Sequence, residues 1–204
     1  MKQFLLVIVT AATIMSVWPQ TINGQAGKAR TIKEIDALAR SIQVIVDGKK
    51  QPDLIFADTA DVDATSGKWR KFASMGALET FREETETYSI AYNWKAKGRL
   101  VASNFTLFSP SGDWSKYVMH FFRPDGSAAM VTSELRTFYG HFIAFRTEYF
   151  DASGKRLKVG TKYMDLSTRT PKKPTQEMLA DNPAFYAVDR FKRVRDLPFS
   201  RLLD

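Results

Sequence analysis

The fold is decided by residues 97–155, which read KGRLVASNFTLFSPSGDWSKYVMHFFRPDGSAAMVTSELRTFYGHFIAFRTEYFDASGK. Glycine stands at positions 98, 112, 126, 140 and 154, so a residue that favours turns recurs every 14 residues. Glycine readily adopts the left-handed backbone conformation that tight reversals need. The spacing therefore predicts strands of equal length joined by tight turns, in an up-and-down antiparallel sheet.

Four of these glycines close similar turn sequences, which are Pro110-Ser111-Gly112, Pro124-Asp125-Gly126, Phe138-Tyr139-Gly140 and Ala152-Ser153-Gly154. We predict a three-residue hairpin loop at each, with the glycine closing a type I turn with a bulge. Loops of this length pair residues of equal parity, so all odd positions from 99 to 163 should face one side of the sheet. The odd positions are mostly apolar and the even positions mostly polar or charged. We therefore expect an apolar core face and a charged solvent face, with His120 on the latter.

The predicted register also specifies cross-strand partners. It places complementary side chains opposite each other, namely Lys116 with Glu134, Trp114 with Arg136, and Glu148 with Lys158. The first hairpin should differ, because residues 88–94 carry their apolar side chains at even positions. We expect a four-residue loop at 95–98 that reverses the parity.

An amphipathic helix is predicted over residues 31–47. Thr31-Ile32-Lys33-Glu34 has the form of a capping box, and the apolar residues that follow recur at the spacing of one helical face: Ile35, Leu38, Ile42, Ile45 and Val46. The fold class is therefore α+β, with this helix packed on a long, curled, half-barrel-like meander of about six strands over residues 80–165. An irregular or helical tail follows over residues 166–204, in which Thr175 caps a short helix.

The first 26 residues are typical of a secretory signal peptide. Lys2 precedes an apolar stretch from Phe4 to Val17, and Gly24-Gln25-Ala26 provides small residues for cleavage after Ala26. An uncleaved anchor is the alternative. We expect residues 27–204 to form a single domain without a transmembrane segment, either periplasmic or secreted. The absence of cysteine from all 204 residues favours a bacterial envelope over an animal secretion.

No catalytic residue, metal site or cofactor is predicted. His120 and His141 are the only histidines, and neither lies in a recognisable motif. The segment 61–67 begins like a calcium loop, but Phe72 stands where the closing glutamate is required. Cross-strand ion pairing accounts for the charged even positions.

Small hydroxyl groups among the apolar odd positions suggest a binding cavity. A curled sheet closed by one helix leaves space at its open end, where hydroxyls amid aromatic walls can orient a ligand. We predict ligand contacts from Ser103, Tyr117, Ser133, Thr147, Tyr149 and Thr161. The chain is thus interpreted as an exported, non-enzymatic binding protein for a small apolar or lipid-like ligand held between sheet and helix.

Two alternatives remain at this point. The first is a hydrolase- or isomerase-like enzyme that uses the same cavity. The second is a structural envelope protein whose basic surface meets an anionic envelope component, through Arg146, Arg156, Lys158, Lys162, Lys172 and Lys173. Nucleic acid is not expected as a partner of an exported chain.

Overall fold

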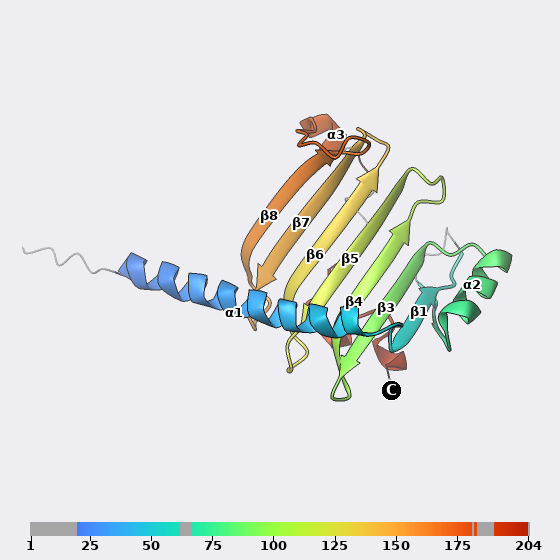
Figure 1. Ribbon diagram of the computed structural model, residues 1–204, viewed down its shortest axis with the longest axis horizontal. Helices are drawn as coiled ribbons and strands as arrows, with labels where there is room; N and C mark the ends of the chain where they lie inside the picture. Colours follow the sequence, from blue (N-terminus) through green and yellow to red (C-terminus); the bar gives the residue numbers. More distant parts are fainter. Residues whose placement is uncertain (1–19, 62–66, 181, 183–189, 204) are drawn as a thin grey trace, which may run out of the picture.

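A computed structural model describes residues 20–61, 67–180, 182 and 190–203, with side chains of the first helix described from residue 27 onward. It shows one eight-stranded antiparallel sheet in the order β2-β1-β3-β4-β5-β6-β7-β8, with a long helix crossing one face near one end of the strands (Figure 1). The fold is α+β, as predicted.

The elements have the following bounds. The strands are β1 (Leu54–Asp58), β2 (Trp69–Phe72), β3 (Ser89–Ala96), β4 (Arg99–Phe108), β5 (Trp114–Phe122), β6 (Ala128–Thr137), β7 (Phe142–Phe150) and β8 (Arg156–Asp165). The helices are α1 (Gln20–Gly48), α2 (Met75–Glu84) and α3 (Gln176–Ala180), followed by the 3-10 helices η2 (Val194–Asp196) and η3 (Ser200–Leu202).

The sheet has eight strands where six were expected. The six strands of the predicted meander are β3 to β8, and the two extra strands come from the segment before it. Ile55 of β1 pairs with Tyr92 of β3 on one side and with Phe72 of β2 on the other. These two strands are only 5 and 4 residues long, too short for a period of two to be distinguished from other apolar patterns.

The five regularly spaced glycines all adopt the left-handed conformation, with φ between 73° and 84°. This confirms that each closes a turn. The predicted loop lengths are wrong, however, at three of the five turns. The last residue pair before each turn defines the length of the loop. These pairs leave two residues in the loop at 97–98 and four in the loops at 110–113 and 138–141. Only the loops at 124–126 and 152–154 hold three residues.

Bulges change the register even where the loop length is correct. The register shifts between Phe121 and Phe122 beside the 124–126 turn, and between Tyr149 and Phe150 beside the 152–154 turn. A bulge adds one residue to one strand and so moves the following side chains to the opposite face. From β4 to β8 the parity of each face therefore alternates from strand to strand, and the prediction of one odd core face is wrong.

The predicted switch at the first hairpin is wrong for the same reason. A two-residue turn and a register shift between Trp94 and Lys95 leave Tyr92 opposite Asn104, so even positions of β3 and β4 share a face. A turn glycine marks where the chain reverses, but neighbouring contacts determine where a bulge forms.

The three predicted cross-strand pairs are each displaced by one residue. Lys116 lies opposite Leu135, Trp114 opposite Thr137, and Glu148 opposite Val159. The placement of His120 on the solvent face is also wrong, because it is fully buried. Its Nε2 accepts a hydrogen bond from the backbone N–H of Phe191 at 3.1 Å. Lys116 and Glu148 are buried as well.

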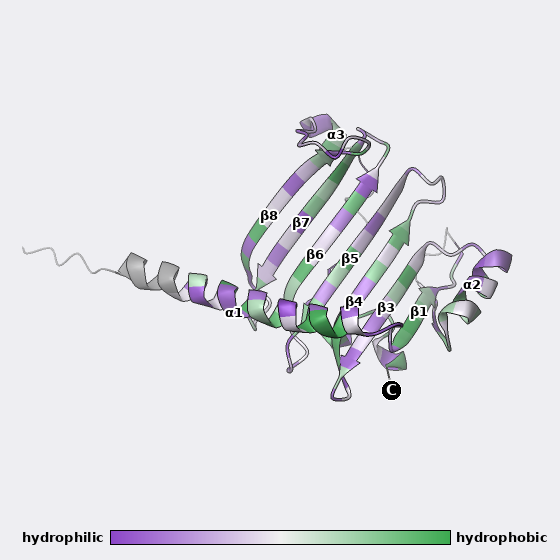
Figure 2. Ribbon diagram, viewed as in Figure 1, coloured by the Kyte–Doolittle hydropathy of each residue, from purple (hydrophilic) through white to green (hydrophobic). Residues whose placement is uncertain are grey.

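Helix α1 packs on the sheet as predicted. Ile35, Ala39 and Ile42 form a buried cluster with residues of β3 to β6, among them Trp94 and Phe121. Figure 2 shows that apolar residues of α1 concentrate where the helix crosses these strands. We call the sheet surface contacted by these helix residues the α1 face.

The capping box predicted at the start of this helix does not form. Helix α1 already begins at Gln20, so Thr31 lies inside it and its hydroxyl donates to the carbonyl of Gly27. Glu34 accepts a hydrogen bond from Arg30 instead. The predicted cleavage position after Ala26 lies within α1.

The last part of the predicted C-terminal segment, residues 190–203, packs on the opposite surface of the sheet. From here on we call these residues the tail and this surface the tail face. Phe199 stacks on Phe56 at 4.4 Å between ring centroids, and Leu197 is buried beside them. Ser127 and Arg193 form an antiparallel bridge that holds the tail to the β5–β6 turn. The predicted cap of α3 is confirmed, since Thr175 Oγ1 accepts from the N–H of Met178 at 3.2 Å.

Candidate ligand-binding site

The six predicted ligand contacts fall on two faces of the sheet. Cross-strand pairing puts Tyr117, Thr147 and Tyr149 on the α1 face, and Ser103, Ser133 and Thr161 on the tail face. The structure therefore does not bring all six together. The reason is the alternating parity described above.

Tyr149 contacts the helix. Its hydroxyl donates to Asp36 Oδ1 of α1 at 2.9 Å. Burial, together with the hydrogen bond and charge of Asp36, raises the pKa of the Tyr149 hydroxyl. This bond joins residues 113 positions apart in the sequence, so it helps to hold α1 against the sheet.

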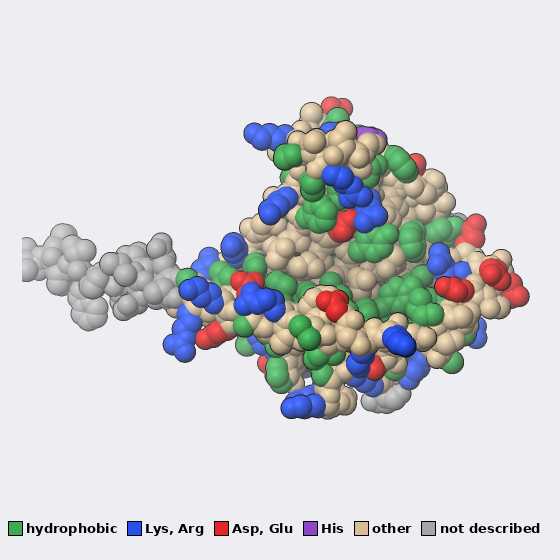
Figure 3. Space-filling view, in the orientation of Figure 1, with side chains coloured by type: hydrophobic (Ala, Val, Ile, Leu, Met, Phe, Trp, Pro, Cys, Tyr) green, Lys and Arg blue, Asp and Glu red, His purple; other side chains and the backbone are tan. Residues whose placement is uncertain are grey.

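Tyr117 and Thr147 line a cavity of about 270 Å³ on the α1 face, which we call the trough. Its other lining residues are Asn104, Met119, Thr132, Ser133, Glu134, Phe145 and Arg146. Figure 3 shows this face as a hollow between α1 and the segment around α3, with hydrophobic side chains on its floor. Helix α1 thus covers one end of the face and leaves the trough open.

The trough combines apolar and polar groups. Tyr117, Met119 and Phe145 are half-buried, so part of each side chain is exposed for contact. Glu134 Oε1 accepts from Nε of Arg136 at 2.7 Å, and the guanidinium of Arg136 lies 5.4 Å from the centre of the Tyr117 ring. The carboxylate is therefore engaged in an ion pair. Such a lining can hold an apolar group and orient a polar one.

A charged cluster lies on the tail face, around the side chain of Glu148. Its exposed fraction is 3%, and its carboxylate accepts from Arg146 at 2.8 Å, Arg190 at 3.1 Å and Arg156 at 3.3 Å. Burial alone would raise the pKa of the Glu148 carboxyl, but the three guanidinium groups hold it below its ordinary value. Glu148 therefore stays ionised at neutral pH. No local pattern in the sequence predicts that these four residues come together.

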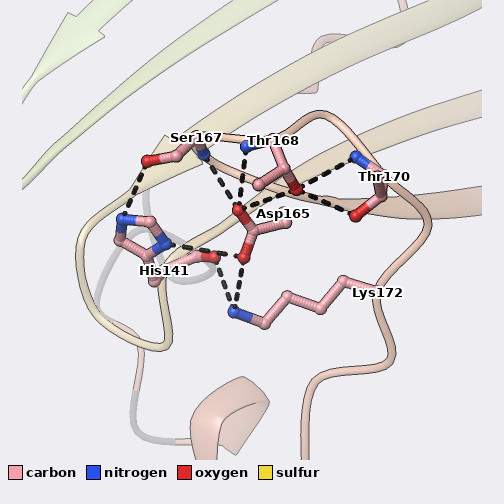
Figure 4. Close-up of polar contacts among 6 residues, drawn as sticks. All are labelled: His141, Asp165, Ser167, Thr168, Thr170 and Lys172. Carbon is pink, nitrogen blue, oxygen red and sulfur yellow. Dashed lines mark hydrogen bonds and ion pairs between the residues drawn. The ribbon is translucent and has the colours of Figure 1, made fainter.

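A third polar cluster lies at the upper rim of the sheet, beside a cavity of about 570 Å³ (Figure 4). His141 Nδ1 lies 3.6 Å from Asp165 Oδ2, and His141 Nε2 lies 3.4 Å from Ser167 Oγ. In space, the serine, histidine and aspartate are thus arranged like a nucleophile, its base and the group that orients the base.

The remaining contacts of this cluster favour a structural role. Both distances exceed the 2.6–3.2 Å or so expected between nucleophile, base and orienting group. The backbone N–H groups of Ser167 and Thr168 both donate to Asp165 Oδ1 at 3.0 Å. These two donors are therefore not available to stabilise an oxyanion.

Asp165 instead joins the end of β8 to the turn before β7. The backbone hydrogen bond from Thr168 is the main cause that holds the pKa of Asp165 well below its ordinary range. Lys172 Nζ donates to Asp165 Oδ2 at 3.3 Å and to the carbonyl of His141 at 2.7 Å. We interpret this cluster as a clamp between two turns.

Within the part of the chain that the structure describes, no group of three or more histidine, aspartate and glutamate residues is placed to hold a metal ion. Residues 62–66 of the calcium-like segment lie outside the described residues. No helix among the described residues has both the length and the apolar character needed to cross a bilayer.

Comparison of the chain with known families, curated proteins and solved structures finds no match. Function is therefore inferred from the geometry of the two sheet faces.

Proposed function

We propose that this chain is an exported, non-enzymatic binding protein that holds a small apolar or lipid-like ligand in the trough on the α1 face. One observation carries the proposal. Helix α1 covers only one end of a hollowed sheet face, and beyond it the half-buried side chains of Tyr117, Met119 and Phe145 line a cavity. Asn104, Thr132 and Thr147 supply amide and hydroxyl groups beside them.

The affinity expected from apolar contacts alone is low. A ligand that removes on the order of 200 Å² of apolar surface from water gains roughly 5 kcal/mol, at about 25 cal/mol per Å². Lost motion on association offsets part of this gain. Binding is therefore expected in the millimolar range, about −4 kcal/mol, unless the ligand also bonds to the polar lining.

Export to a bacterial envelope is part of the proposal, and it is supported by residues 1–26 and by the absence of cysteine. Cleavage after Ala26 would leave the buried apolar residues of α1 intact, since these begin at Ile35. The intact mass of the exported protein tests this, because a mass corresponding to residues 27–204 is expected. A full-length mass would contradict the cleavage.

Native mass spectrometry of the protein purified from its own host tests for a bound ligand. Titration with a fluorescent fatty-acyl probe then locates the site. Tyr117→Ala and Phe145→Ala should each weaken probe binding by about tenfold, because each removes an aromatic surface from the trough.

Val159→Ala is the matched control. Val159 is an exposed apolar residue on the tail face, so its loss should leave probe affinity unchanged. The proposal fails if no ligand co-purifies and the probe does not bind. It fails equally if the trough variants and the control bind the probe alike.

A further inference from the structure

A cavity of about 140 Å³ on the tail face has a lining unlike that of the trough. Three cationic side chains and one carboxylate line it, from Lys116, Arg146, Arg190 and Glu148. Ser133, Thr161 and Tyr163 add hydroxyl groups, and Val131, Leu135 and Ala144 complete the lining.

We infer that this cavity binds the oxyanion head of an organic anion, with the apolar part of the same molecule in the neighbouring cavity. Ser133 and Arg146 belong to the linings of both cavities, but their side chains point to the tail face, whereas Glu134 points to the α1 face. The two cavities therefore lie on opposite faces of the sheet. The site on the tail face requires an anionic head group, and it does not depend on the proposed function.

Arg146 is the main donor to the anion. Its Nε bonds to Glu148 Oε1 at 2.8 Å, and this is its only hydrogen bond or ion pair among the described residues. The terminal nitrogens of the guanidinium keep their N–H groups for a ligand. A planar guanidinium presents these N–H groups in a fork that matches carboxylate and phosphate oxygens.

Glu148 does not block the site, although it is an anion. Its carboxylate is buried and already accepts hydrogen bonds from three arginines. These bonds hold Arg146 and Arg190 in place beside the cavity. An anion in the cavity therefore meets oriented cations, with little further ordering of long side chains required.

The hydroxyl groups supply neutral donors. Those of Ser133, Thr161 and Tyr163 have no hydrogen bond to any other described residue. Hydroxyl donors can complete the coordination of an oxyanion that arginine binds from one side.

The neighbouring cavity shows where the rest of the ligand lies. It has a volume of about 260 Å³ and shares Val131 and Arg190 with the charged cavity. Its lining is otherwise mainly apolar, from Ala128, Phe150, Gly154 and Phe191, and is completed by Lys192. A molecule with an anionic head and an apolar chain can therefore occupy both cavities at once.

Calorimetric titration of the full chain with octanoate and octyl phosphate tests the inference. At least one of them should bind, and the preferred one identifies the head group. Acetate and inorganic phosphate lack the chain, and octanol lacks the charge, so each should bind at least about tenfold more weakly. The inference is overturned if neither eight-carbon anion binds, or if octanol, acetate or inorganic phosphate binds as well as they do.

Two charge-removing variants locate the head group. Arg146→Gln should weaken binding of the preferred anion by about tenfold or more. Lys162→Gln removes the same charge from the exposed α1 face of β8 and should have no effect. Thermal unfolding of both variants verifies that they fold. Equal losses in the two variants would reveal non-specific attraction and overturn the site.

Tyr117→Ala separates the inference from the proposed function. If it weakens octanoate binding and Arg146→Gln does not, octanoate occupies the trough. The tail-face site is then overturned while the proposed function stands. If Arg146→Gln alone acts and the acyl probe ignores the trough variants, the inference stands and the proposed function fails.

Discussion

The two faces of this sheet are built from alternate residues of the same strands, yet they differ in what covers them. On the α1 face, one helix buries apolar residues at one end and leaves the trough open beyond it. On the tail face, Phe199 and Leu197 cover Phe56 of β1, and the carboxylate of Glu148 is buried among three arginines at β7. Glu148 and Tyr149 are consecutive on β7 and face opposite sides.

The difference teaches where each kind of stability comes from. Contact between α1 and the sheet is mainly apolar, so it depends little on pH. A buried carboxylate is costly unless cations surround it, and Glu148 has three. The tail face should therefore carry most of the pH dependence of stability.

The largest effect is expected from Phe199→Ala. Phe199 is 1% exposed and stacks on Phe56, so truncation leaves a cavity that should cost about 3–5 kcal/mol of unfolding free energy. Denaturation in urea measures the loss. Phe138→Ala is the control, because Phe138 is 66% exposed and its truncation should cost less than about 0.5 kcal/mol. Equal losses would mean that the tail does not stabilise the sheet.

Glu148→Gln should have the next largest effect, about 2 kcal/mol at neutral pH, since it leaves three arginines without their carboxylate. The partial exposure of these arginines keeps the loss below that of a fully buried pair. Glu134→Gln is the control on the α1 face, where Glu134 is more exposed and forms an ion pair with Arg136.

The pH dependence of stability should distinguish these two variants. The pKa of Glu148 is lowered in the folded chain from an ordinary value of 4.5. Its contribution to stability is thus complete above that pH and is lost as the pH falls through the lower folded value. Below pH about 4.5, Glu148→Gln should therefore approach the stability of the parent chain. A constant difference down to pH about 2 would contradict the role given to this charge.

The smallest effect is expected from Tyr149→Phe, which removes the hydroxyl that binds Asp36 of α1. Loss of one hydrogen bond at a half-buried position should cost about 1 kcal/mol. Hydrogen exchange of the α1 amides should become faster at the same time. Tyr139→Phe, at an exposed tyrosine in a turn, should leave both measurements unchanged.

Much of the fold could be predicted from local pattern. The glycines at 98, 112, 126, 140 and 154 mark the turns because a turn needs a left-handed residue, and glycine adopts that conformation without help from distant contacts. The apolar spacing of Ile35 and Ile42 predicted a helix against the sheet. Strands β1 and β2 were missed because short apolar runs have no distinctive period.

The candidate sites were harder to predict, because both depend on register. Tyr117 and Thr147 do line one cavity, but Thr161 lines another on the opposite face, and Ser133 contributes to both linings. Arg146 was predicted on the surface and instead lies half-buried beside Glu148. One additional residue in a strand reverses the facing of every side chain beyond it.

By itself, the sequence determined the number and position of the turns in the meander, the amphipathic helix and the α+β class, because each depends on residues close together in the chain. Only the tertiary structure decided the bulges, the side of the sheet that each side chain faces, and the meeting of Glu148 with Arg190. These features depend on contacts between distant segments. Local preferences give several strand registers nearly equal free energy, and the distant contacts decide which register forms.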